Sequence, residues 1–189
     1  MAEILFYNTH LAKDYDKFKE ICNNHDVKII EVGEDHVDHY VGYLLGLEGF
    51  TDEKKTGIDE NMNIDFDFIL FSNFDNEKMF SVMDDLRESG ANVQHKAGTT
   101  QNNVTWSLRE LLIENDQEAR TMGLIHKINA QLEKASDLKE KYGADDRTKA
   151  LIEEIQGFFQ DSSIFSIDKA KAYYLKLMDE NLRVEKENQ

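Results

Sequence analysis

An almost uninterrupted apolar run, FDFILF at Phe66–Phe71, places the strongest limit on the fold. A short run this rich in aromatic and aliphatic side chains is typical of a β-strand covered on both faces. Three other short runs predict further strands, at Ile4–Tyr7, Val27–Val32 and Asn92–His95. The last of them is polar, which indicates a strand at the edge of the sheet.

Amphipathic segments separate the predicted strands. Apolar residues recur at helical spacing in three places, which are Tyr15, Phe18, Ile21 and Cys22, then Val37, Tyr40, Val41, Leu44 and Leu45, and finally Met79, Phe80, Val82, Met83 and Leu86, followed by Gly90. Helical connections of this length allow consecutive strands to run parallel. For residues 1–115 we therefore predict an α/β domain with a small, mainly parallel sheet of about four strands and helices packed on it.

Residues 116–189 show only helical periodicity and predict an all-helical extension of about three helices. The third helix has a wide apolar face, because Leu175, Met178 and Leu182 extend the set formed by Ile167, Ala170, Tyr174, Leu177 and Val184. A face this wide is buried against more than one neighbour. We therefore expect these helices to pack on each other, on the α/β domain, on a second copy of the chain or on another protein.

The charge of the chain limits its partners. Of 189 residues, 38 are acidic and 22 basic, giving a net charge of −16. Residues 1–115 carry 23 of the acidic and 10 of the basic side chains. This balance argues against nucleic acid as a partner, because affinity for phosphates comes mainly from Lys and Arg. No signal-peptide pattern or membrane-length apolar run is present, and the single cysteine excludes a disulfide framework. We expect a cytoplasmic protein with no membrane span and no cofactor.

Polar side chains follow three of the predicted strands. Ligands of parallel α/β sheets bind beside the carboxyl ends of the strands. The candidate ligand-binding residues at these positions are Asn8, His10, Ser72, Asn73, Lys96, Thr100 and Asn103. If the sheet is parallel, they lie along one rim and suit a polar or anionic small ligand. The alternative is that the Asn, Ser and Thr side chains cap helices or hold turns.

The segment after the fourth predicted strand is the densest in such residues. Ser107 and Glu110 have the spacing of a capping box, which begins a helix. That register makes Trp106 a packing anchor rather than a platform for stacking a ligand. Lys96, Thr100 and Asn103 are not used by the cap, so they are the leading candidates for a functional surface.

The run from Lys28 to Ala119 resembles an uncharacterised bacterial domain family of unknown function. The resemblance is carried by YVGYLLGLEGF at 40–50, FILFSNF at 68–74 and K-x-x-x-T-x-x-N-x-x-W-x-x-x-E-L-L from Lys96 to Leu112. The family's pattern often has proline where this chain has Gln101. This difference affects the predicted type of turn and not the alignment of the segment. The resemblance implies a bacterial cytosolic protein and implies no activity.

Other arrangements do not form a recognisable catalytic or metal site. His36 and His39 lie one helical turn apart, but the sequence ties no third metal ligand to them. Cys22 falls on an apolar helix face, where a small buried side chain is the usual role. The spacing of residues in the sequence indicates no set of nucleophile, base and orienting group. The sequence therefore identifies no catalytic residues.

The polar, glycine-containing stretch Gly49–Ile64 is too long for an ordinary connection. It predicts either an exposed insertion or a lid over a site.

Three hypotheses for function follow. The first is a non-catalytic regulatory or adaptor module that binds a protein, or a second copy, through the helices of residues 116–189. The second is a small-ligand binder or an unrecognised enzyme with its site at the rim of the sheet. The third is an acidic mimic of a nucleic-acid backbone that binds a basic protein.

Overall fold

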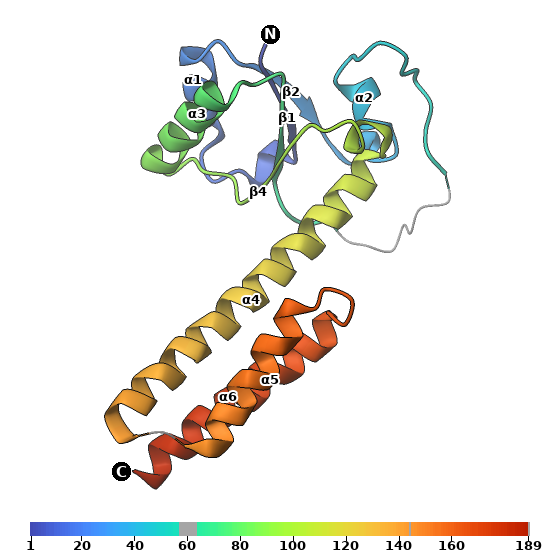
Figure 1. Ribbon diagram of the computed structural model, residues 1–189. Helices are drawn as coiled ribbons and strands as arrows, with labels where there is room; N and C mark the ends of the chain where they lie inside the picture. The colour runs from blue at the N-terminus through green and yellow to red at the C-terminus, as the bar shows by residue number, and fades with distance from the viewer. Residues whose placement is uncertain (57–63, 144, 189) are drawn as a thin grey trace. The chain divides into compact units, whose positions relative to one another are not determined.

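The computed structural model describes residues 1–56, 64–143 and 145–188 (Figure 1). The chain divides into two compact units, Met1–Gln117 and Glu118–Gln189, which we call the α/β unit and the helical unit. The predicted fold class is confirmed, since a four-stranded sheet with packed helices is followed by a long helical region. Within the described ranges, no helix combines the length and the apolar character that crossing a membrane requires.

The sheet contains four strands in the order β2-β1-β3-β4. The strands are β1 (Glu3–Tyr7), β2 (Lys28–Val32), β3 (Phe68–Ser72) and β4 (His95–Gly98). β1 pairs parallel with β2, and β3 pairs parallel with β4. The central pair, β1 and β3, is antiparallel. The sheet is therefore mixed, with two parallel strand–helix–strand units joined back to back.

The strands of each parallel pair are connected by a helix whose N-cap residue is an aspartate. In α1 (Tyr15–Asn24), the Asp14 side chain accepts a hydrogen bond from the backbone N–H of Lys17. In α3 (Asn76–Ser89), Asp75 does the same for the N–H of Lys78. Gly90 ends α3 in the left-handed conformation, as the sequence predicts. The two helices lie side by side on one face of the sheet (Figure 1).

Successive side chains of the central strands point to opposite faces of the sheet, and each face is covered by an apolar core. On β1, Ile4 and Phe6 face α1 and α3, while Leu5 and Tyr7 face the opposite side. That second core contains Val37, Val41 and Leu45 together with Leu108, Leu111 and Leu112 from the start of α4 (Leu108–Tyr142). β3 is buried at every position, so the prediction of a strand covered on both faces is confirmed.

Two predicted elements differ from the structure. The continuous helix expected over Val37–Leu45 is reduced to the short α2 (Val41–Leu44), because the backbones of His39 and Tyr40 form bridges to Lys54 and Ser107. The fourth strand begins at His95 rather than ending there. Val93, the apolar residue of the predicted strand, is buried in the core beside α3 before the strand begins.

The helical unit consists of the later part of α4, α5 (Asp146–Gln160) and α6 (Ile167–Glu187). Ile128, Ala135, Ile155, Phe158, Ala170 and Leu177 form its buried core, to which all three helices contribute. Phe158 makes aromatic contacts with Phe159, Phe165 and Tyr173. The predicted helical extension is thus a three-helix assembly with a core of its own.

Candidate functional site

The segment between β4 and α4 closes on itself through the side chains of Thr100 and Asn103. The backbone N–H of Thr100 donates to Asn103 Oδ1 over 2.8 Å, and the N–H of Asn103 donates to Thr100 Oγ1 over 3.1 Å. Asn103 Nδ2 also donates to the Gly98 carbonyl over 2.9 Å. Asn103 is buried. Both side chains are therefore occupied in holding the turn, which is the alternative that the sequence left open.

The predicted capping box at the start of α4 is present. The N–H of Glu110 donates to Ser107 Oγ over 3.1 Å, and the N–H of Ser107 donates to Glu110 Oε2 over 2.8 Å. Lys55 Nζ contacts the same carboxylate oxygen over 2.8 Å. Trp106 packs against the core that contains Leu111, as the predicted packing anchor requires. These contacts fix the orientation of the turn relative to α4.

Lys96 is directed to the loop that precedes its own strand. Its Nζ donates to the Val93 carbonyl over 2.7 Å and to Asn92 Oδ1 over 3.3 Å. Burial of the half-buried ammonium lowers the pKa of Lys96, while the nearby Asp67 carboxylate acts in the opposite direction. The charge of Lys96 is thus partly compensated within the fold.

The candidate residues do not share one rim, and that expectation is wrong. Because β1 and β3 are antiparallel, Tyr7 lies opposite Phe68, and Glu3 lies opposite Ser72. Asn8 and His10 follow β1 at one end of the strands, whereas Ser72 ends β3, and Asn73 follows it, at the opposite end. β4 runs parallel to β3, so Thr100 and Asn103 lie at the same end as Ser72. The expectation of a parallel sheet required a long helix between β2 and β3. The short α2 lies there instead.

Asn8 and Asn73 occupy equivalent turns in the two halves of the sheet. Both have a left-handed backbone with φ of 58°, a conformation that asparagine tolerates better than most residues. Asn8 is buried, and its Nδ2 donates to the Phe66 carbonyl over 3.3 Å. Asn73 and His10 are exposed, and Ser72 is buried. The left-handed turns account for the two asparagines without a ligand.

The rings of His36 and His39 lie 6.2 Å apart, whereas Cys22 lies in the core beside α1 and α3. His36 Nδ1 lies 2.7 Å from an Asp35 carboxylate oxygen, and His39 Nε2 lies 2.9 Å from Asp52 Oδ1. Burial raises the pKa of the Cys22 thiol to about 12, so it is protonated at neutral pH. Among the residues that the structure describes, no group of three or more His, Cys, Asp or Glu side chains is placed to hold a metal ion.

Part of the predicted lid, Gly49–Ile64, lies outside the described residues, since 57–63 are not described. Its first part is anchored to the α/β unit. The N–H of Lys55 donates to the Asp38 carbonyl over 2.8 Å, and Lys54 pairs with His39.

A charged network in the helical unit was not predicted from the sequence. Glu180 on α6 is only 3% exposed, and its carboxylate contacts Arg183 at 2.6 Å and Arg147 at 3.1 Å. Thr148 Oγ1 donates to Glu180 Oε1 over 3.0 Å, and Arg183 also contacts Asp145 at 2.9 Å. The i, i+3 spacing of Glu180 and Arg183 was visible in the sequence. Their contacts with Asp145, the N-cap residue of α5, and with Thr148 on α5 could not be predicted.

The network predicts that the helical unit loses stability in acid. Hydrogen bonds from Arg183 lower the pKa of Glu180, and the Thr148 N–H together with Arg183 lowers the pKa of Asp145 to about 2. A carboxylate whose pKa is lower in the folded chain stabilises the fold above its unfolded pKa, and this stabilisation is lost as the pH falls. We therefore expect the melting temperature to fall between pH 4.5 and about 2, measured by far-ultraviolet circular dichroism.

Glu180→Gln tests this pH dependence. The fall in melting temperature should be smaller in this variant than in the wild type, because one titrating carboxylate has been removed. Glu133→Gln, at an exposed position on α4, is the control and should follow the wild type. Identical profiles for wild type and Glu180→Gln would show that this carboxylate does not contribute.

Comparison with known families identifies one segment of the chain. Residues 67–122 match the family described as Domain of unknown function (DUF3783). The matched segment includes β3, α3, β4, the Thr100–Asn103 turn and the first part of α4. Comparison with curated proteins and with solved structures gave no match.

The match confirms the expected resemblance to a domain of unknown function over part of its predicted range. The K-x-x-x-T-x-x-N-x-x-W segment lies inside the matched residues, and 28–66 lie outside them. Asn8, His10, α5 and α6 also lie outside.

Proposed function

We propose that this protein is a non-catalytic regulatory or adaptor module that binds a partner protein through α6. One observation carries the proposal. Ile167, Leu175 and Leu182 are 37%, 52% and 42% exposed on α6, and the partly buried Met178 lies between the last two in sequence. The spacing of these four residues places them on one side of the helix. We call Ile167, Leu175, Met178 and Leu182 the α6 stripe.

The α6 stripe is separate from the apolar side that packs inside the helical unit. Ala170, Leu177 and Val184 on that side are buried. The wide apolar face expected from the sequence is therefore only half covered by the chain itself. Leucine side chains are unfavourable when they are exposed to water, and burying them against a partner stabilises the complex. The i, i+3, i+7 spacing of Leu175, Met178 and Leu182 matches the way in which one helix packs on another.

The partner that suits this surface is a basic protein that offers an amphipathic helix. The chain carries a net charge of −16, and a basic protein would be attracted to it over distance. α6 itself has five acidic and five basic side chains, so the α6 stripe is not surrounded by one sign of charge. A second copy of the chain would bring a second charge of −16, and that repulsion disfavours self-association.

The setting of the protein is also a proposal. The resemblance of residues 28–119 to a bacterial family, together with the single buried Cys22, supports a bacterial cytoplasmic protein. The acidic composition supports a protein partner rather than nucleic acid.

The other two hypotheses receive less support. A small-ligand site at the rim of the sheet requires seven side chains to converge, and they lie at opposite ends of antiparallel strands. The acidic-mimic hypothesis and the α6 proposal both expect a basic partner, but acidic mimicry requires no apolar contact. It can therefore be separated from the α6 proposal by removing the stripe while keeping the charge.

The test is a fluorescence anisotropy titration with a labelled synthetic helix of about 18 residues, or five turns. The peptide carries leucines at i, i+3, i+4 and i+7 and lysines on its other face, and a matched peptide has glutamates in place of the lysines. We expect the basic peptide to bind and the acidic peptide not to bind. Leu175→Gln/Leu182→Gln should weaken binding about 30-fold, because covering each leucine contributes about 1 kcal/mol.

The control is Met122→Gln/Ile164→Gln, which replaces two other exposed apolar side chains of the helical unit without changing the charge. It should bind the basic peptide as the wild type does. Equal binding by the stripe variant would contradict the proposal and favour acidic mimicry. A dimer of the wild type in analytical ultracentrifugation that the stripe variant abolishes would instead identify a second copy as the occupant.

A further inference from the structure

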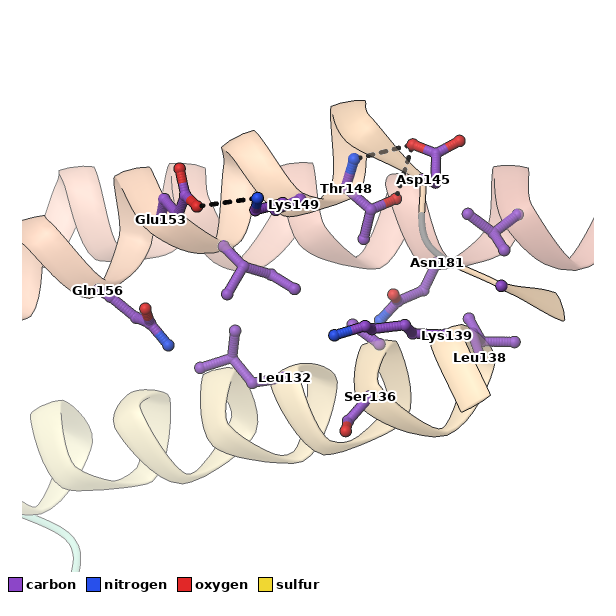
Figure 2. A pocket seen from close by; sticks show the side chains of 14 residues that line it. Leu132, Ser136, Leu138, Lys139, Asp145, Thr148, Lys149, Glu153, Gln156 and Asn181 are labelled. Atoms are coloured by element: carbon purple, nitrogen blue, oxygen red, sulfur yellow. Dashed lines mark hydrogen bonds and ion pairs between the residues drawn. The ribbon is translucent and has the colours of Figure 1, made fainter. Parts of the chain in front are cut away.

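The helical unit contains a cavity of about 520 Å³ between α4, α5 and α6, within the size range of small-molecule sites (Figure 2). Its walls are largely apolar, with Leu132 from α4, Ile152 from α5 and Val184 from α6. None of the residues predicted as ligand-binding lines it, and it is separate from the α6 stripe.

Asn181 provides a polar group inside this cavity. The residue has 0% exposure, and Figure 2 shows its side chain extending from α6 into the space between α4 and α5. Asn181 Nδ2 donates to the backbone carbonyl of Gln131 over 2.9 Å and to its Oε1 over 3.0 Å. Asn181 Oδ1 is buried and has no hydrogen-bond partner among the described residues. A buried acceptor without a partner is unfavourable, and a ligand with an N–H or O–H group would satisfy it.

Two lysines place positive charge at the cavity. Lys139 is exposed on α4, and in Figure 2 its side chain lies along the cavity near Asn181. Within the described residues, its ammonium has no ion-pair partner. Lys149 lines the opposite wall and lies 3.9 Å from Glu153, so its charge is partly balanced. Lys139 is therefore the cation available to an anionic ligand.

We propose that this cavity binds a small amphipathic carboxylate whose apolar body carries one hydrogen-bond donor. The apolar body packs against Leu132, Ile152 and Val184, the donor reaches Asn181 Oδ1, and the carboxylate pairs with Lys139. Each of the three requirements rests on a different feature of the cavity. Together they select the ligand by chemistry rather than by size alone.

Isothermal titration calorimetry with three probes tests the proposal. Indoleacetate has an aromatic body, an N–H donor and a carboxylate, naphthylacetate lacks the donor, and indole lacks the carboxylate. We expect indoleacetate to bind with a stoichiometry of one. Naphthylacetate should bind about fivefold more weakly because it forms no hydrogen bond with Asn181. Indole should bind about tenfold more weakly because it forms no ion pair with Lys139.

Two charge-reversal variants make the test specific. Lys139→Glu should weaken indoleacetate binding at least tenfold, since attraction is replaced by repulsion. Lys127→Glu changes the net charge equally at an exposed position of α4 outside the cavity, and it should leave binding unchanged. Absence of binding by indoleacetate, or equal binding by Lys139→Glu and wild type, would overturn the proposal. Equal affinities for indoleacetate and naphthylacetate would overturn the role of Asn181.

The proposed carboxylate site is independent of the proposed partner binding by α6. Leu175→Gln/Leu182→Gln should bind indoleacetate as the wild type does, because neither leucine lines the cavity.

Discussion

Arg183→Leu is expected to destabilise the helical unit and to lower the urea concentration at its unfolding midpoint. Arg183 contacts both Glu180 and Asp145, and Glu180 is almost fully buried. Removing the guanidinium leaves the Glu180 carboxylate in the interior with Arg147 and the Thr148 hydroxyl as its remaining partners. A buried charge that loses its main partner costs more than the pair contributes when intact, because the desolvation penalty remains.

Urea unfolding followed by circular dichroism measures this loss. Lys186→Leu removes a positive charge from an exposed position of the same helix and should change the stability by less than about 0.5 kcal/mol. Glu180→Leu/Arg183→Leu should recover much of the loss, since replacing both members of a buried ion pair by apolar residues is often neutral. Equal stabilities of Arg183→Leu and Lys186→Leu would show that the network does not hold the helical unit together.

Asn103→Ala is expected to lower the stability of the α/β unit by about 2 kcal/mol in the absence of any ligand. The substitution removes the buried Asn103 side chain, so that the Thr100 N–H and the Gly98 carbonyl, which belong to exposed residues, lose their hydrogen-bond partner. Asn102→Ala is the matched control. Its side chain is exposed, and only its backbone carbonyl takes part in the turn.

The experiment also separates the two roles that the sequence left open for Asn103. A residue that holds a turn changes stability by itself, whereas a residue that only binds a ligand can be replaced without loss of stability. Thermal unfolding followed by the fluorescence of Trp106, in the same turn, reports on this unit directly. A variant as stable as the wild type would contradict the structural role and restore Asn103 as a binding candidate.

Local signals were sufficient to predict much of the fold. The buried strand β3 was marked by its continuous apolar run, and α3 was marked by its stripe and by Gly90. The capping box at Ser107 and Glu110 was correct because its residues satisfy each other within one turn. These elements depend on neighbours close in sequence, so their residues carry the necessary information.

Features that depend on distant partners were missed. The helix expected over Val37–Leu45 gave way to pairing of His39 and Tyr40 with Lys54 and Ser107. The direction of β3 depends on the connection that precedes it, and this direction divided the predicted rim. The cavity arises from three helices that meet in space, and the Glu180 network arises from two of them, α5 and α6. Periodicity indicated those helices but not which polar side chains they would bring together.

The segment that matches a known family does not include the surface that we propose as functional. Residues 67–122 contain the Thr100–Asn103 turn, while the α6 stripe begins at Ile167. The matched segment therefore supports an account of the α/β unit, and the binding function must be tested on the helical unit itself.

The most direct test of the proposed function is an amide chemical-shift map of the full chain titrated with the basic amphipathic peptide. We expect the largest shifts at Leu175, Met178 and Leu182, with weaker and salt-sensitive shifts on the acidic α/β unit. That result would place the contact on the α6 stripe. Shifts confined to the acidic surface of residues 1–115, with α6 unchanged, would contradict the account and leave charge alone as the basis of binding.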